Sequence, residues 1–157
     1  MEKFKGTLNK ISDQRGAAAV EFAIILPLLV VFLFGIIEFS IMFYDKAVIT
    51  NASREGARAG IVFDDPRIDA PGIRSIIYNY LDANPDGTDP KRLISFGPDP
   101  LTPPPVTACV DSGDELVVTV TYTYDFLIVP DILAAFFSGG AFGSGATISA
   151  TTKMRCE

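Results

Sequence analysis

Residues 22–44 read FAIILPLLVVFLFGIIEFSIMFY, and this apolar run decides the fold. From Phe22 through Ile37 there are sixteen residues without a charge. Counted to Tyr44, the run would form a helix about 34 Å long at the standard rise of ~1.5 Å per residue. The hydrocarbon core of a bilayer is about 30 Å thick. The sequence therefore predicts one membrane-spanning helix at about residues 22–44.

The charges on the two sides of this run differ in sign. Residues 1–16 carry four basic and two acidic side chains, whereas residues 45–157 carry nine basic and fifteen acidic ones. The positive-inside rule therefore predicts a cytoplasmic N-terminus and an extracytoplasmic body. The whole chain has a net charge of −6. Because it lacks a basic patch for backbone phosphates, we expect no nucleic-acid partner.

The composition also limits the chemistry of the chain. It has no histidine, so the commonest general base, the commonest zinc ligand and every His-assisted nucleophile are missing. Residues 138–145 are glycine-rich, but no Lys-Ser or Lys-Thr pair follows them, which excludes a P-loop. Asp86-Gly87-Thr88-Asp89 lacks the further acidic ligands of a calcium loop. We expect no enzyme, no metal site and no cofactor.

The residues around the apolar run favour a retained anchor over a secretory signal peptide, which is the alternative. A signal peptide has an apolar region of about 7 to 15 residues and then a small-residue cleavage site. This run is longer, and Glu38-Phe39-Ser40-Ile41-Met42-Phe43 is a poor cleavage site. The run is preceded by Arg15-Gly16-Ala17-Ala18-Ala19-Val20-Glu21-Phe22. Here a glycine is followed five residues later by a glutamate and then by an aromatic residue.

This segment resembles the processing motif of type IV pilins and pseudopilins, which a membrane aspartic prepilin peptidase cuts after the glycine. With three further segments it is similar to the TadE-like minor pilins of tight-adherence (Flp, type IVb) pilus systems. Those segments are Leu26-Pro27, Phe34-Gly35-Ile36-Ile37-Glu38-Phe39 and Thr50-Asn51-Ala52-Ser53-Arg54-Glu55-Gly56-Ala57-Arg58. The likeness is strongest over residues 15–60. Phe22 departs from the tyrosine that many relatives carry.

The resemblance implies cleavage between Gly16 and Ala17, which makes Glu21 the fifth residue of the mature chain. It implies a structural role as a minor pilin or pseudopilin needed to assemble a tight-adherence pilus. The implied partners are the prepilin peptidase, other pilins or pseudopilins and the inner-membrane assembly platform. The implied location is the bacterial cytoplasmic (inner) membrane, crossed once. A membrane-anchored extracytoplasmic ligand-binding module unrelated to pili is the alternative function.

Two carboxylates, Glu21 and Glu38, lie at or within the apolar region. A carboxylate in hydrocarbon is costly without a partner. Cleavage after Gly16 would create a cationic α-amino group on Ala17, with which Glu21 of a neighbouring subunit could pair. The alternative is that Glu21 extends to the cytoplasmic interface. For Glu38 the alternatives are contact with the outer headgroups and contact with a partner helix.

The predicted fold class is α+β, a long N-terminal transmembrane helix that continues into a small extracytoplasmic domain with an antiparallel sheet. Beyond the span, one helical face carries Val48, Ala52, Gly56, Ala59 and Phe63. Asp64-Asp65-Pro66 is expected to end the helix, since proline restricts the residue before it. The predicted divisions are a leader at residues 1–16, the helix at 17–60 and the domain at 61–157.

The domain is predicted to contain one short helix and four strands. The helix rests on the spacing of Ile73, Ile76, Ile77, Tyr80 and Leu81 between breakers. The predicted strands are Leu93–Phe96, Val106–Val110, Glu115–Phe126 and Ala146–Cys156. Apolar and polar residues alternate along the last two strands. Asp111-Ser112-Gly113-Asp114 is predicted to form the turn before Glu115–Phe126.

Cys109 and Cys156 are the only cysteines in the chain. Both lie in predicted strands on the oxidising side of the membrane, so we expect a disulfide between them, with two buried thiols as the alternative. Residues 126–137 are apolar but too few to span a bilayer. We expect them to fill the core, with an exposed interface as the alternative.

Overall fold

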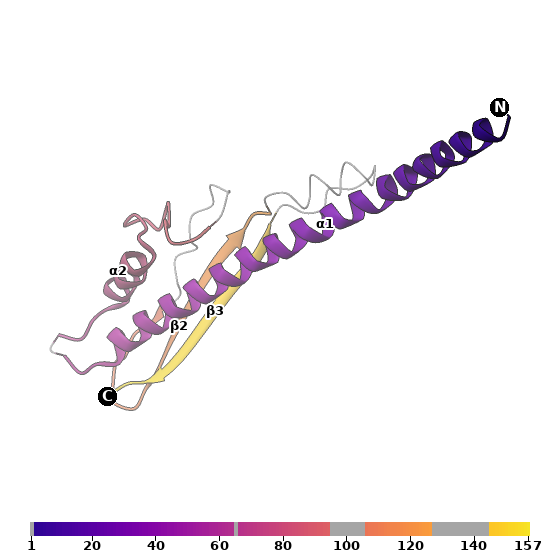
Figure 1. Ribbon diagram of the computed structural model, residues 1–157. Helices are drawn as coiled ribbons and strands as arrows, with labels where there is room; N and C mark the ends of the chain where they lie inside the picture. The colour runs from indigo at the N-terminus through magenta and orange to yellow at the C-terminus, as the bar shows by residue number, and fades with distance from the viewer. Residues whose placement is uncertain (1, 65, 95–105, 127–144) are drawn as a thin grey trace. The chain divides into compact units, whose positions relative to one another are not determined.

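The computed structural model describes residues 2–64, 66–94, 106–126 and 145–157, with side chains from Gly16 onward. Its elements are α1 (Glu2–Ile61), α2 (Ala70–Leu81), β1 (Val106–Thr107), β2 (Glu115–Tyr124) and β3 (Ala146–Arg155) (Figure 1). The predicted α+β class is therefore confirmed, with a long apolar helix before a small antiparallel sheet. The chain divides into two compact units, Met1–Ile37 and Glu38–Glu157.

The first unit is the N-terminal part of α1, which stays helical through Pro27. Its large apolar side chains face outward, and Leu28 and Phe32 are 72% and 69% exposed. Between Gly16 and Ile61, α1 is long and apolar enough to cross a membrane, and its most apolar part is not buried in the protein. A helix with apolar side chains on all sides is suited to lipid. This part of α1 is consistent with a single-pass membrane anchor.

The second unit packs the rest of α1 against α2 and the sheet. Ser53 of α1 and Thr152 of β3 share a hydrogen bond of 2.7 Å between their hydroxyl oxygens. A β-carbon added at Gly60 would lie 2.6 Å from Ile73 Cδ1 of α2 and 2.8 Å from Leu116 Cδ2 of β2. Such distances are shorter than van der Waals contact, so glycine here permits the close approach of both elements.

The face predicted on α1 is confirmed for its small residues. Ala52 and Gly56 are buried, while Val48 and Ala59 are half-buried. The prediction is wrong for Phe63, which follows the end of the helix and is 70% exposed. Its ring instead lies 5.0 Å from the guanidinium carbon of Arg67.

The short helix α2 confirms the periodicity found in the sequence. Asp69 caps its N-terminus by accepting a hydrogen bond of 2.8 Å from the backbone N–H of Gly72. Ile73, Ile77 and Leu81 are fully buried on its inner face. Asp82 ends the helix in the left-handed conformation, with φ of 52°.

The sheet has the order β1-β2-β3, and both pairs are antiparallel. Glu115 pairs with Arg155 at one end of β2, and Tyr124 pairs with Ala146 at the other. The inward face of β2 is buried along its whole length, at Leu116, Val118, Val120, Tyr122 and Tyr124. The outward positions of β3 are exposed, at Thr147, Ser149, Thr151, Lys153 and Arg155. Both alternations agree with the sequence prediction.

Two predicted strands are corrected by the structure. Of Val106–Val110 only Val106 and Thr107 form a strand. Leu93 and Ile94 are not in a strand, because the Leu93 N–H donates to Pro90 O and the Ile94 N–H donates to Asp45 Oδ1. Residues 95–105 and 127–144 lie outside the described residues, so the expectation for the apolar segment 126–137 is addressed only at Phe126, which is half-buried.

Candidate functional site

The predicted processing residues lie together on α1 in the first unit. Gly16, Ala17, Glu21 and Phe22 are all exposed. A β-carbon added at Gly16 would meet no atom within 4 Å. The peptide bond between Gly16 and Ala17 is nevertheless inside a helix, so a peptidase would act on a locally opened form. Glycine favours such opening because it stabilises a helix less than alanine does.

Glu38 is the first residue of the second unit and is only 3% exposed. The hydroxyl of Tyr124, the last residue of β2, donates a hydrogen bond of 2.7 Å to Glu38 Oε1. Burial, and then the adjacent Glu38 carboxyl, raises the pKa of Tyr124, so the hydroxyl keeps its proton and acts as the donor. The end of the sheet is therefore fastened to α1 at Glu38.

The two contacts considered for Glu38, with the outer headgroups and with a partner helix, stay predictions. The carboxyl has a partner in its own chain, 86 residues away in sequence. The signal in the sequence was the tyrosine at an inward position of β2. A buried tyrosine needs a hydrogen-bond partner for its hydroxyl.

Asp45 lies seven residues after Glu38 on α1, beyond the apolar run, and is fully buried. Its Oδ1 accepts a hydrogen bond of 2.8 Å from the Ile94 N–H, while its Oδ2 is buried without a hydrogen-bond partner among the described residues. Burial raises the pKa of Asp45 to about 6, and the bond from Ile94 opposes this shift. Sequence analysis assigned Asp45 no role, although its spacing from Glu38 places both on one side of the helix.

The buried acids of this region do not form a metal site. Within the part of the chain that the structure describes, no three Cys, Asp or Glu side chains are grouped closely enough to hold an ion. The Oδ1 atom of Asp86 accepts hydrogen bonds from both the N–H and the hydroxyl of Thr88. Glu38 and Asp45 instead hold separate segments of the second unit against α1.

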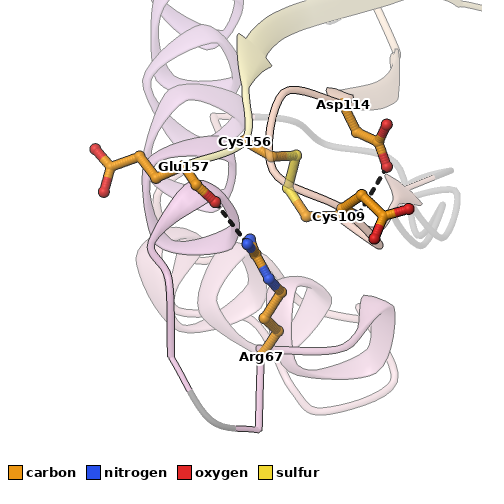
Figure 2. Close-up of a disulfide and its surroundings, with 6 residues drawn as sticks. Arg67, Cys109, Asp114, Cys156 and Glu157 are labelled. Atoms are coloured by element: carbon orange, nitrogen blue, oxygen red, sulfur yellow. Dashed lines mark hydrogen bonds between the residues drawn. A yellow bond between two sulfur atoms is a disulfide. The ribbon is translucent and has the colours of Figure 1, made fainter.

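The disulfide joins Cys109 to Cys156, the pair that the sequence indicated (Figure 2). Their Cα atoms are 5.9 Å apart, and both residues are buried. The bridge connects the residue that follows β3 to the segment between β1 and β2. It therefore fixes the C-terminal end of the sheet.

Hydrogen bonds around the disulfide tie the C-terminus to α1 and to a turn. The Glu157 N–H donates to Ile61 O at 3.1 Å, and Arg67 Nη2 donates to Glu157 O at 2.5 Å (Figure 2). The Cys156 N–H donates to Asp114 O at 2.8 Å. These bonds hold the last two residues against the end of α1 and the turn before β2.

Residues 16–58 match the model of the family described as TadE-like protein. Residues 16–58 are a TadE-like segment. No curated protein and no solved structure matches the chain.

The TadE-like segment begins at Gly16 and contains Ala17, Glu21, Phe22 and Glu38. It coincides with the exposed apolar helix and the first part of the second unit. The groups that meet Glu38 and Asp45, at Tyr124 and Ile94, lie outside the matched residues.

The buried carboxyl of Asp45 predicts a pH dependence of stability. Its pKa is raised in the folded protein, so the folded chain binds this proton more tightly than the unfolded chain does. The free energy of unfolding should therefore fall as pH rises from about 4 to about 6, by up to about 3 kcal/mol, and level off above that. Asp45→Asn keeps an oxygen for the Ile94 N–H and should remove this contribution. Urea unfolding of the full chain in detergent micelles measures it, and an equal pH slope in both proteins would contradict it.

The disulfide predicts a large contribution to the stability of the second unit. It closes a loop with a sequence separation of 47, for which loop entropy gives on the order of 4 kcal/mol. The double variant Cys109→Ser, Cys156→Ser should lose about this much free energy of unfolding, measured by denaturant titration. Reduction of the unaltered chain is the control and should give the same loss. An unchanged midpoint in both experiments would show that sheet pairing alone holds β3.

Proposed function

We propose that the chain is a minor pilin or pseudopilin of the TadE type, a structural component needed to assemble a tight-adherence pilus. The observation that carries this proposal is that the TadE-like segment begins at Gly16 and runs along an exposed apolar helix of membrane length. In this proposal the chain crosses the bacterial cytoplasmic membrane once, with a cytoplasmic N-terminus. Residues 1–16 are its leader, about 22–44 its span and the region from residue 61 its extracytoplasmic domain.

The processing step assigns roles to four exposed residues of the first unit. A prepilin peptidase would cut between Gly16 and Ala17, where a β-carbon on Gly16 would have no atom of the described structure within 4 Å. The cut leaves an α-amino cation on Ala17, and Glu21 lies about 6 Å further along the helix at ~1.5 Å per residue. Glu21 is exposed, so its carboxylate is open to the amine of a neighbouring pilin. Phe22 would begin the lipid-facing surface.

The alternative function, a membrane-anchored ligand-binding module, shares the anchor but not the processing. An anchored module functions with its N-terminal residues in place, whereas a pilin subunit joins its neighbours through the amine that cleavage creates. Cleavage after Gly16 therefore separates the two proposals.

In native membranes with an active prepilin peptidase, mass spectrometry of this protein should show a chain that begins at Ala17. Gly16→Leu should abolish cleavage by crowding the peptidase subsite that accepts glycine, while this chain itself has room for the larger side chain. A native chain that still carries residues 1–16 would contradict the pilin proposal and favour the anchored module.

Glu21→Ala is the matched control for this experiment, since it alters an exposed residue of the same motif without blocking the cut site. It should be cleaved as the unaltered chain is, yet enter the pilus system poorly. Normal piliation in this variant would mean that Glu21 only extends to the cytoplasmic interface.

A further inference from the structure

Three aromatic side chains cover the outer side of α1 where the second unit begins. Phe39, Phe43 and Tyr44 are 55%, 65% and 49% exposed, and we call them the aromatic face. Phe39 and Phe43 are four residues apart, which places them one above the other on the helix. Glu38 and Asp45 are buried within the same unit. Residues 38–45 of α1 therefore carry the sheet on one side and exposed aromatic rings on the other.

The length of the uncharged run shows that these rings are needed to fill the membrane. Residues 22–37 span about 24 Å as a helix, which is about 6 Å less than a typical hydrocarbon core. Glu21 limits the run at its N-terminal end. The missing distance corresponds to about four residues beyond Ile37, which reaches about residue 41. By this count the hydrocarbon ends within the aromatic face.

We propose that the aromatic face is a lipid-contacting surface that seats the extracytoplasmic domain in the headgroup region of the leaflet on its side. Tyrosine is enriched at this boundary because it combines an apolar ring with a polar hydroxyl, whereas a phenylalanine ring is apolar throughout and suits the hydrocarbon just inside the boundary. In this proposal Phe39 and Phe43 lie against the acyl-chain segments next to the headgroups, and the hydroxyl of Tyr44 lies among the headgroups. This inference rests on the proposed membrane span and adds that the second unit, which begins at Glu38, meets the headgroup region through these residues of α1.

Lipid fits the aromatic face better than a protein partner does. The face continues the exposed apolar surface of α1, where Ile36 and Ile37 are 54% and 43% exposed. The charge of the body is of the wrong sign for attraction to anionic headgroups, since residues 45–157 carry nine basic and fifteen acidic side chains. Contact must then come from apolar burial, and it should occur in vesicles of zwitterionic lipid alone.

The absence of tryptophan from the chain makes the test direct. Single-tryptophan variants Phe32→Trp, Phe43→Trp and Phe63→Trp place a probe at three positions of similar exposure, 69%, 65% and 70%. The full chain is reconstituted in phosphatidylcholine vesicles that carry a spin label either at the headgroup or in the middle of the acyl chain. We expect the mid-chain label to quench Phe32→Trp most, the headgroup label to quench Phe43→Trp most, and neither label to quench Phe63→Trp.

The three probes separate failure of this inference from failure of the proposed span. If Phe43→Trp is quenched as weakly as Phe63→Trp while Phe32→Trp is quenched, the membrane span is supported and the proposal that the aromatic face contacts lipid is overturned. If Phe32→Trp is not quenched either, the proposed membrane span is wrong, and lipid contact by the aromatic face is wrong with it. If Phe43→Trp is shielded from both labels until the protein is diluted with lipid, the aromatic face binds protein, and the proposal that it contacts lipid is overturned. Phe39→Trp repeats the measurement on the same face.

Discussion

The hydrogen bond from the Tyr124 hydroxyl to the Glu38 carboxyl joins the end of the sheet to α1 within the second unit. The bond is buried and 2.7 Å long, and it joins the last residue of β2 to Glu38, the residue of α1 at which the second unit begins. A carboxyl within an apolar run is costly unless it has a partner. Tyr124 supplies that partner, and in return its own hydroxyl is satisfied. The acid that interrupts the apolar run is thus also the point at which the end of β2 is joined to α1.

The TadE-like segment contributes one side of three polar contacts between α1 and the rest of the second unit. Its Glu38, Asp45 and Ser53 face Tyr124, Ile94 and Thr152, all of which lie outside the matched residues. At the other end of the helix, the C-terminus is held by Ile61 and by the disulfide. Within the second unit, the sheet and the C-terminus are therefore fixed to α1 near both ends of the stretch Glu38–Ile61. This arrangement agrees with the proposed role of a structural subunit whose folded domain is carried on a membrane helix.

The fold could be predicted where the signal is local. Alternation of apolar and polar residues located β2 and β3, and helical spacing located α2. The two cysteines indicated their own pairing because there are only two. The prediction failed at Leu93 and Ile94, whose apolar character suggested a strand. The Leu93 N–H bonds to Pro90 O in a local turn, and the Ile94 N–H bonds to the distant Asp45 side chain, a tertiary contact that overrides local propensity.

The candidate sites divide in the same way. Gly16, Ala17, Glu21 and Phe22 form one contiguous motif, so sequence alone could find them. Glu38 and Asp45 act through partners 86 and 49 residues away, and no short-range pattern encodes those pairings. The exposed position of Phe63 was not predicted, because helical spacing does not show that α1 ends at Ile61, before Phe63.

The central claim is that Glu38 and Tyr124 act as a pair, and a double-mutant cycle tests it most directly. Tyr124→Phe removes only the hydroxyl, Glu38→Leu replaces the carboxyl with an apolar group of similar size, and the double variant removes both. Unfolding free energies of the full chain in detergent micelles give the coupling. We expect each single variant to be destabilised and the double variant to lose less than the sum, with a coupling energy of about 1–3 kcal/mol. Losses that add to within about 0.5 kcal/mol would contradict the account.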